Sequence, residues 1–190
     1  MYELVPSISP DEIQERVGEL AGRLNLDYEG RSVVLIGILK GAFVFLADLI
    51  RDLTFPLKVD FVRLASYGQK AETCGTVQIT KDIELPIRGA DVLVVEDIVD
   101  TGTTLAWYVE HLRKYGPSSI KTCVLIDKAE RRQVDIAVDY ACFRIDKGFI
   151  VGYGLDFSEN HRNLPGIYEV EFLKQEPETG GLLKGKDGCR

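Results

Sequence analysis

The chain has 190 residues, 45% of them hydrophobic, and a formal net charge of −7. This length suits a single domain with a sizeable core, and the negative charge argues against a general nucleic-acid surface, which needs clustered Lys and Arg. The four cysteines lack a CxxC spacing, the two histidines stand apart, and no long apolar stretch or basic leader is visible in the sequence, so we expect no zinc site and a cytoplasmic protein.

The first half of the chain alternates predicted helices and strands. Ser9-Pro10-Asp11-Glu12 is a capping box with proline at the first helical position, and the apolar spacing after it predicts a helix with one buried face. Residues 32–39 are a predicted buried strand, residues 42–53 a helix and residues 57–64 a second strand. The polar segment 65–73 follows and is typical of a loop.

The most informative stretch is VLVVEDIVDTGTTL, residues 92–105. Its first four residues predict a strand buried on both faces, with Glu96 and Asp97 at the carboxyl end, where open α/β sheets bind ligands. The turn DTGTT, residues 100–104, leads into a predicted helix. Free N–H groups and the helix dipole favour a phosphate there, and Gly102 allows its close approach. The run therefore predicts a site for a phosphorylated ribose.

The second half continues the alternation. Further strands are predicted at residues 120–126, near residues 136–138 and 141–144, and at residues 149–153. Alternating strands and helices predict an α/β fold with a central, mainly parallel sheet flanked by helices. Residues 176–190 are glycine-rich and polar, which predicts a flexible tail.

The run at residues 92–105 resembles the phosphoribosyl pyrophosphate motif of the type I phosphoribosyltransferases, in which a hydrophobic strand precedes two acidic residues and D-[ST]-G-x-T. The resemblance implies the fold of that family, with residues 1–175 as one domain whose N-terminal and C-terminal segments form a small hood over the base site. It implies that Glu96 and Asp97 hold ribose hydroxyls and Mg²⁺. It also implies a 5′-phosphate site at Thr101, Gly102, Thr103 and Thr104.

Smaller motifs make the resemblance specific to the hypoxanthine-guanine phosphoribosyltransferases over roughly residues 36–164. Leu39-Lys40-Gly41 resembles the family's pyrophosphate-binding segment, which commonly has a cis peptide before the lysine, so we expect a cis Leu39-Lys40 bond. Alone, a lysine at a strand end is more typical of a solvated cation. Ser66-Tyr67-Gly68 resembles the family's lid loop, which would exclude water from an oxocarbenium-like state.

Lys128 and the segment beginning at Phe149 resemble the family's purine site. By that resemblance Phe149 stacks on the base, the backbone of Ile150 reads its edge, and Lys128 donates to the 6-oxygen, which adenine lacks. Asp156 would lie near magnesium-bound pyrophosphate, and Arg162 would contact the pyrophosphate. Without the resemblance, Phe149 would be interpreted as a core aromatic and Asp156 as a carboxylate in a turn. The Asp146-Lys147-Gly148 turn before Phe149 could shift by one residue, so the residue that stacks on the base stays open by one position.

The resemblance implies Mg²⁺-dependent transfer of the 5-phosphoribosyl group from phosphoribosyl pyrophosphate to hypoxanthine or guanine, with Asp100 as the general base. It further implies a homodimer or homotetramer, with no nucleic-acid or membrane partner. A xanthine-preferring enzyme stays open. A phosphoribosyl pyrophosphate-sensing regulator of the same fold is disfavoured because the sequence shows no basic stretch. A receiver-type signalling domain is disfavoured because the first predicted strand ends in Leu39-Lys40 rather than in acidic residues.

Overall fold

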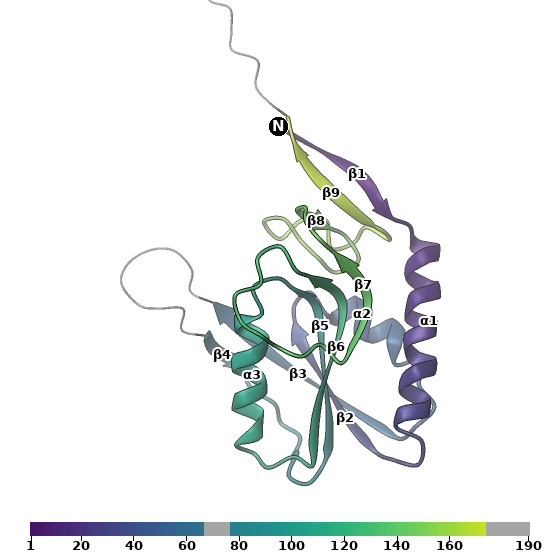
Figure 1. Ribbon diagram of the computed structural model, residues 1–190, viewed down its shortest axis with the longest axis vertical. Helices are drawn as coiled ribbons and strands as arrows, with labels where there is room; N and C mark the ends of the chain where they lie inside the picture. The colour runs from purple at the N-terminus through teal and green to yellow at the C-terminus, as the bar shows by residue number, and fades with distance from the viewer. Residues whose placement is uncertain (67–76, 174–190) are drawn as a thin grey trace, which may run out of the picture.

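The computed structural model describes residues 1–66 and 77–173, which form two sheets and three helices within these ranges (Figure 1). In chain order the elements are β1 Tyr2–Ile8, α1 Pro10–Asp27, β2 Val33–Leu39, α2 Phe43–Leu49, β3 Leu57–Ser66, β4 Val77–Lys81, β5 Asp91–Val99, α3 Thr103–Arg113, β6 Ser119–Lys128, β7 Tyr140–Ile145, β8 Ile150–Val151 and β9 Ile167–Phe172. The large sheet has the order β4-β3-β2-β5-β6-β7, and all its pairs are parallel except β3 with β4. The predicted α/β class with a mainly parallel sheet is confirmed.

Helix α1 begins with the predicted capping box. The Glu12 amide donates to Ser9 Oγ at 3.2 Å, and the Ser9 amide donates to Glu12 Oε2 at 2.9 Å, so two amides at the helix start are satisfied. The apolar spacing also predicted the buried face correctly. Its members are Ile13, Val17, Leu20, Ala21 and Leu24.

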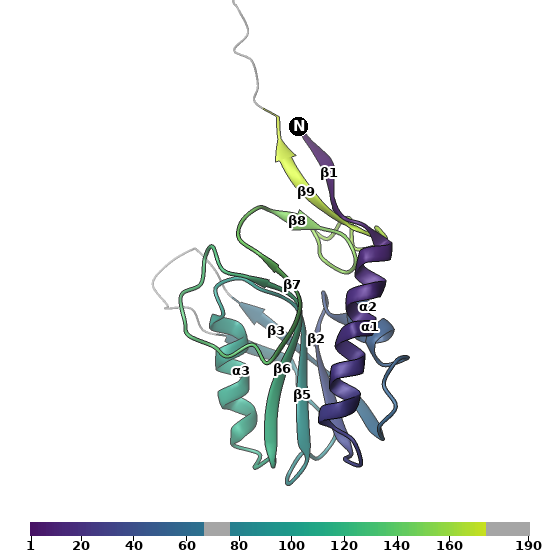
Figure 2. The same ribbon diagram turned by 45° about the vertical axis from the view of Figure 1, so that its right-hand side comes forward.

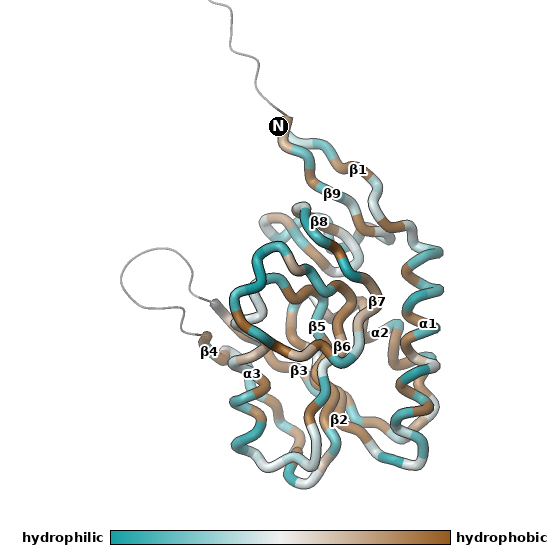
Figure 3. Tube along the Cα trace, in the orientation of Figure 1, coloured by the Kyte–Doolittle hydropathy of each residue, from teal (hydrophilic) through white to brown (hydrophobic). Residues whose placement is uncertain are grey.

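Helices cover both faces of the large sheet (Figure 2). Helices α1 and α2 supply side chains to one hydrophobic cluster, and α3 supplies them to another. Strand β2 takes part in both clusters, because Val33 and Leu35 lie in the first and Val34 and Ile36 in the second, as expected for a strand buried on both faces. Figure 3 shows the hydrophobic residues concentrated along the central strands. In the described ranges, no helix has the length and apolar character needed to cross a bilayer.

A buried carboxylate anchors the connection between β4 and β5. Asp60 on β3 accepts hydrogen bonds from the amides of Phe61 at 2.7 Å, Glu84 at 2.6 Å and Leu85 at 2.9 Å. Burial raises the pKa of Asp60, but these amide hydrogen bonds and the charge of Lys81 outweigh burial, so the net pKa lies below its ordinary value. The ionised carboxylate therefore stabilises the folded chain.

Two elements are shorter in the structure than the sequence predicted. The helix predicted over residues 42–53 ends at Leu49, because the chain passes into turns on the way to Pro56, and a proline disfavours helix just before it. The strand predicted at residues 149–153 is only β8, because Gly152, Tyr153 and Gly154 all have positive φ angles that no strand adopts.

Two other predictions also change. A strand near residues 136–138 was wrong, because β7 takes the place beside β6 and the carbonyl of Ala137 accepts a hydrogen bond from the Thr122 hydroxyl at 2.9 Å. Strand β5 runs to Val99, so Glu96 and Asp97 lie within its last part instead of after its end.

The small sheet has the order β1-β9-β8 and joins the two ends of the described chain. Strands β1 and β9 pair antiparallel from Tyr2 with Phe172 to Ile8 with Ile167, an arrangement that the sequence did not predict strand by strand. The loop after β8 packs against the end of β2, since a Cβ on Gly154 would lie 2.2 Å from the carbonyl oxygen of Gly41. A single domain over residues 1–175 stays a prediction, and the predicted tail at residues 176–190 lies outside the described residues.

Candidate active site

The site begins where the strand order of the large sheet reverses. Strand β2 has β3 on one side and β5 on the other, and in open α/β sheets ligands bind outside the carboxyl ends of strands at such a point. Lys40 and Gly41 follow β2, and the Leu39-Lys40 peptide is cis, as predicted. Gly41 lies directly against the Asp97 carboxylate, because a Cβ at position 41 would be 1.5 Å from Asp97 Oδ2. A side chain at position 41 would therefore displace the Asp97 carboxylate.

The acidic pair Glu96 and Asp97 offers oxygen ligands at this crevice. Burial raises the pKa of the partly buried Glu96 well above its ordinary value, and the adjacent Asp97 raises it further. A bound cation or hydroxyl donors would offset this cost of ionisation, and carboxylate oxygens are the ligands that Mg²⁺ prefers. In residues 1–66 and 77–173, no three His, Cys, Asp or Glu side chains gather into a metal-binding group. The chemistry fits an ion that takes its remaining ligands from substrate and water.

The predicted phosphate turn lies between β5 and α3. Gly102 has φ +80° and is the residue before α3, and it has no side chain to cap the helix. The Thr103 amide makes a long hydrogen bond of 3.4 Å to Thr101 Oγ1, which an anion could replace. The carbonyl of Thr101 holds the segment after β6 against the turn, because it accepts hydrogen bonds from the amides of Gln133 at 2.9 Å and Val134 at 3.3 Å. A cavity of about 140 Å³ borders the turn, with Thr104 in its wall. The geometry suits a phosphate.

Asp100 and Lys128 are brought together from the ends of β5 and β6. Lys128 Nζ lies 3.9 Å from Asp100 Oδ1 and 3.4 Å from Glu130 Oε2, and its side chain is only 9% exposed. Asp100 Oδ1 is buried and has no hydrogen-bond partner within the described part of the chain. Its other oxygen lies 3.5 Å from Arg131. One carboxylate oxygen is therefore free to accept a proton beside a buried cation.

Arg132 is a residue that sequence reasoning missed. Its guanidinium donates to the carbonyls of Asp100, Val99 and Lys128, each at 3.2 Å, and pairs with Asp127. It thus ties the end of β5 to the end of β6. A basic residue soon after a predicted strand was the only sequence signal, and it does not say which carbonyls the side chain reaches.

The predicted pyrophosphate residues also come together. Arg162 pairs with Asp156 at 2.7 Å and with Glu159 at 3.3 Å, and Lys40 Nζ lies 2.8 Å from Glu159 Oε2. The hydrogen bond from Lys40, followed by that from Arg162, lowers the pKa of Glu159. Glu159 was not predicted. Nothing in the sequence pattern indicated that its side chain would bridge the two cations.

The predicted base-contacting residues lie on the small sheet. Phe149 is 45% exposed and packs edge-on against Phe157 with 5.4 Å between ring centroids, and Ile150 is buried in β8. No hydrogen bond or ion pair links these two residues to Lys128 in the parts of the chain described, so their roles stay predictions. Ser66 ends β3, while the rest of the predicted lid, including Tyr67, lies outside the described residues.

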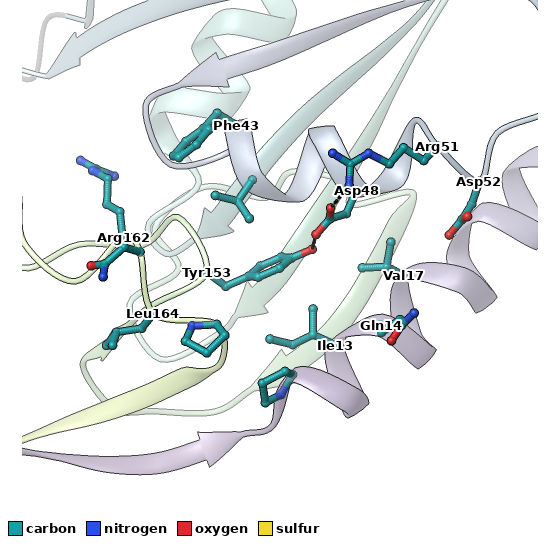
Figure 4. A pocket seen from close by; sticks show the side chains of 14 residues that line it. Ile13, Gln14, Val17, Phe43, Asp48, Arg51, Asp52, Tyr153, Arg162 and Leu164 are labelled. Atoms are coloured by element: carbon teal, nitrogen blue, oxygen red, sulfur yellow. Dashed lines mark hydrogen bonds and ion pairs between the residues drawn. The ribbon is translucent and has the colours of Figure 1, made fainter.

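A larger cavity, about 650 Å³, lies between α1, α2 and the segment 162–165 (Figure 4). Within it the Tyr153 hydroxyl donates to Asp48 at 2.7 Å. Among the described residues, Arg162 is the predicted site residue in its wall, and its guanidinium is engaged by Asp156 and Glu159. The cavity thus shares one residue with the predicted site at the strand ends.

Comparison with known proteins agrees with this geometry. Residues 9–158 match the family described as Phosphoribosyl transferase domain. The hypoxanthine-guanine phosphoribosyltransferase of Aquifex aeolicus (strain VF5) is 43% identical over 165 residues, covering 86% of this chain and 93% of that protein. That of Bacillus subtilis (strain 168) is 43% identical over 160 residues, covering 84% and 89%.

A solved structure gives the same result. The crystal structure of a hypoxanthine-guanine phosphoribosyltransferase from Bacillus anthracis str. 'Ames Ancestor' superposes with a TM-score of 0.83 at 43% identity, covering 90% of this chain and 99% of that chain. The fold and the site define a phosphoribosyltransferase, which is a transferase enzyme. Within that class, the chain belongs to the hypoxanthine-guanine phosphoribosyltransferase family.

Proposed function

We propose that the chain transfers the 5-phosphoribosyl group from phosphoribosyl pyrophosphate to hypoxanthine or guanine, giving IMP or GMP and pyrophosphate. The observation that carries the proposal is the pair of Asp100 and Lys128, 3.9 Å apart and beside the open phosphate turn. A proton acceptor, a buried hydrogen-bond donor and a phosphate site within one crevice are what transfer of a phosphorylated ribose to a 6-oxopurine needs.

The ribose and its phosphates would be held by charge and by backbone donors. The turn at residues 101–104 binds the 5′-phosphate, and Glu96 and Asp97 accept hydrogen bonds from the ribose hydroxyls. Lys40 and Arg162 stabilise the negative charge that develops on the leaving pyrophosphate. Magnesium held by Glu96 and Asp97 together with substrate oxygens would supply further neutralisation of that charge, and Asp156 would lie near the magnesium-bound pyrophosphate.

Asp100 would act on the purine. Its free oxygen takes a proton from one nitrogen of the imidazole ring while the other ring nitrogen bonds to C1′ of the ribose, and the bond from C1′ to the pyrophosphate oxygen breaks. Phe149 stacks on the base and the Ile150 backbone contacts its edge. Closure of the lid that includes Ser66 and Tyr67 excludes water that would otherwise intercept the sugar cation.

Lys128 would select the base. Its ammonium is a donor only, so it matches the 6-oxygen of hypoxanthine, guanine or xanthine and leaves the 6-amino group of adenine facing another donor. Such a mismatch costs about 1–3 kcal/mol or more, because both groups stay buried without a partner. A preference for xanthine is the nearest rival, since all three oxopurines satisfy Lys128 equally.

Two further proposals rest on the family alone. We expect a homodimer or homotetramer, which light scattering coupled to size exclusion would detect. We also expect a cytoplasmic location, where the proposed phosphorylated substrates are found.

One experiment tests the activity. The purified protein is incubated with phosphoribosyl pyrophosphate, Mg²⁺ and each of hypoxanthine, guanine, xanthine and adenine, and nucleotide formation is followed by absorbance and chromatography. We expect turnover with hypoxanthine and guanine. Turnover with adenine alone would contradict the role given to Lys128, and binding of nucleic acid without nucleotide synthesis would favour a regulator.

A further inference from the structure

The two cations proposed to bind pyrophosphate already share one carboxylate. Glu159 Oε2 lies 2.8 Å from Lys40 Nζ and 3.3 Å from an Arg162 Nη atom. These residues come from the end of β2 and from the loop between β8 and β9, so a single oxygen bridges two elements of different sheets. Pyrophosphate oxygens carry the same charge and need the same N–H donors.

Arg162 is held in place by contacts other than that with Glu159. One Nη donates to the carbonyl of Gly154 at 2.8 Å, and the other lies 2.7 Å from Asp156 Oδ1, so the guanidinium stays in place when Glu159 moves away. Its Nε is buried and makes no hydrogen bond to any group in the described residues. The side chain of Glu159 is 65% exposed, so it can turn into solvent without burying a charge. Displacement of Glu159 by a stronger anion is therefore sterically open.

The backbone places Glu159 over the cations. Ser158 and Glu159 have φ angles of +51° and +66°, in the left-handed region that non-glycine residues adopt uncommonly and that often marks functional loops. The Glu159 amide donates to Asp156 Oδ2 at 2.8 Å and closes this turn. Because the turn itself is fixed, the position of the carboxylate does not depend on a freely rotating loop.

We propose that Glu159 sets the affinity for pyrophosphate by occupying Lys40 and Arg162 in the free protein. The inference rests on the proposed function and identifies a residue that acts against binding. Both the diphosphate of the substrate and the released pyrophosphate must displace this carboxylate. Glu159 therefore weakens the binding of both and favours release of the product.

The test is calorimetric titration of inorganic pyrophosphate, with Mg²⁺, into the wild-type protein and Glu159→Gln. The substitution keeps the shape of the side chain and removes its charge. Two ion pairs of the exposed Glu159 carboxylate are lost, each of modest strength beside solvent, so we expect pyrophosphate to bind about 2- to 10-fold more tightly. The KM for phosphoribosyl pyrophosphate should fall by a similar factor. If the substitution only disrupted the loop, pyrophosphate would bind more weakly and the KM for phosphoribosyl pyrophosphate would rise.

Two controls sharpen the result. Glu19→Gln removes the same charge from an exposed pair on α1 and should leave the pyrophosphate affinity unchanged. In a Lys40→Gln background the gain from Glu159→Gln should shrink, because one of the two cations is gone. Unchanged or weaker binding in Glu159→Gln, with the protein folded as judged by its melting temperature, would overturn the inference. Tighter pyrophosphate binding without nucleotide synthesis by the wild type would support it and overturn the proposed function only.

Discussion

The free oxygen of Asp100 leads to a defined kinetic prediction for Asp100→Asn. The amide cannot take a proton at neutral pH, so the contribution of a general base is lost while the shape of the side chain is kept. General bases contribute about 10²- to 10⁴-fold, which is roughly 3–5 kcal/mol on the barrier at 1.36 kcal/mol per decade. We therefore expect turnover with hypoxanthine to fall by about 10²- to 10⁴-fold.

The structure also predicts that substrate binding changes little. The backbone of Asp100 is held through its carbonyl by Arg132, and Lys128 keeps Glu130 at 3.4 Å as a counter-charge. The loss of stability should be on the order of 1 kcal/mol, since the lost ion pair is long at 3.9 Å and Lys128 keeps a carboxylate partner. The assay is steady-state kinetics with a thermal melt and a titration of ribose 5-phosphate. Asp52→Asn, an exposed change at a distance from the site, is the matched control. Near-normal turnover in Asp100→Asn would refute the assignment.

Three other substitutions test the surroundings of the site. Arg132→Met removes hydrogen bonds to three carbonyls, so we expect kcat/KM for both substrates to fall about 10- to 100-fold by steady-state kinetics, with only partial recovery in Arg132→Lys, which lacks the planar fork. Gly41→Ala pushes a methyl group into the Asp97 carboxylate and should raise the KM for phosphoribosyl pyrophosphate at least tenfold. Asp60→Asn should lower the free energy of unfolding at pH 7 by about 1–3 kcal/mol in urea denaturation. Because the folded pKa of Asp60 lies below its ordinary value of 3.8, its stabilisation is complete above the unfolded pKa and is lost as the pH falls toward the folded pKa, so the two proteins should converge in acid.

Control substitutions distinguish these specific losses of activity and stability from a general loss of folded protein. Arg144→Gln removes an exposed partner of Asp127 at 3.8 Å without touching the loop carbonyls, and a loss of activity equal to that of Arg132→Met would contradict the bridging role. Gly18→Ala adds a methyl group in open space on α1 and should preserve activity, with a small gain in helix stability. For Asp60, a stability difference that stays unchanged as the pH falls below the ordinary pKa of 3.8 toward the lower folded pKa would contradict the charge argument.

Sequence reasoning predicted candidate site residues from signals that are local. The capping box at Ser9, the continuous apolar run of β2 and the turn after Val99 depend on neighbours within a few residues. For the same reason the sequence could predict that Lys40 lies at the end of one strand and that Asp100 begins the turn before a helix. The family resemblance then gave these positions candidate roles and the cis peptide before Lys40.

Other features depend on residues far apart in the chain, and only the tertiary structure decided them. Strands β1 and β9 pair across more than 150 residues, and no local pattern fixes such a partner. The apolar residues 136–138 have the composition of a strand, yet β7 pairs with the side of β6 that β5 leaves open. Phe149 and Ile150 lie at the small sheet, and their contacts to the base stay a prediction.

By itself, the sequence of this chain determined the α/β class, and it predicted a phosphate turn with Asp100 beside it. These follow from apolar periodicity and from the conformational needs of glycine and capping residues. The fold decided that Gly41 lies on Asp97, that Arg132 ties β5 to β6, and that Glu159 bridges Lys40 and Arg162. Such contacts arise only when strand order brings separate loops to one edge of the sheet, because side-chain reach is set in space and not along the chain.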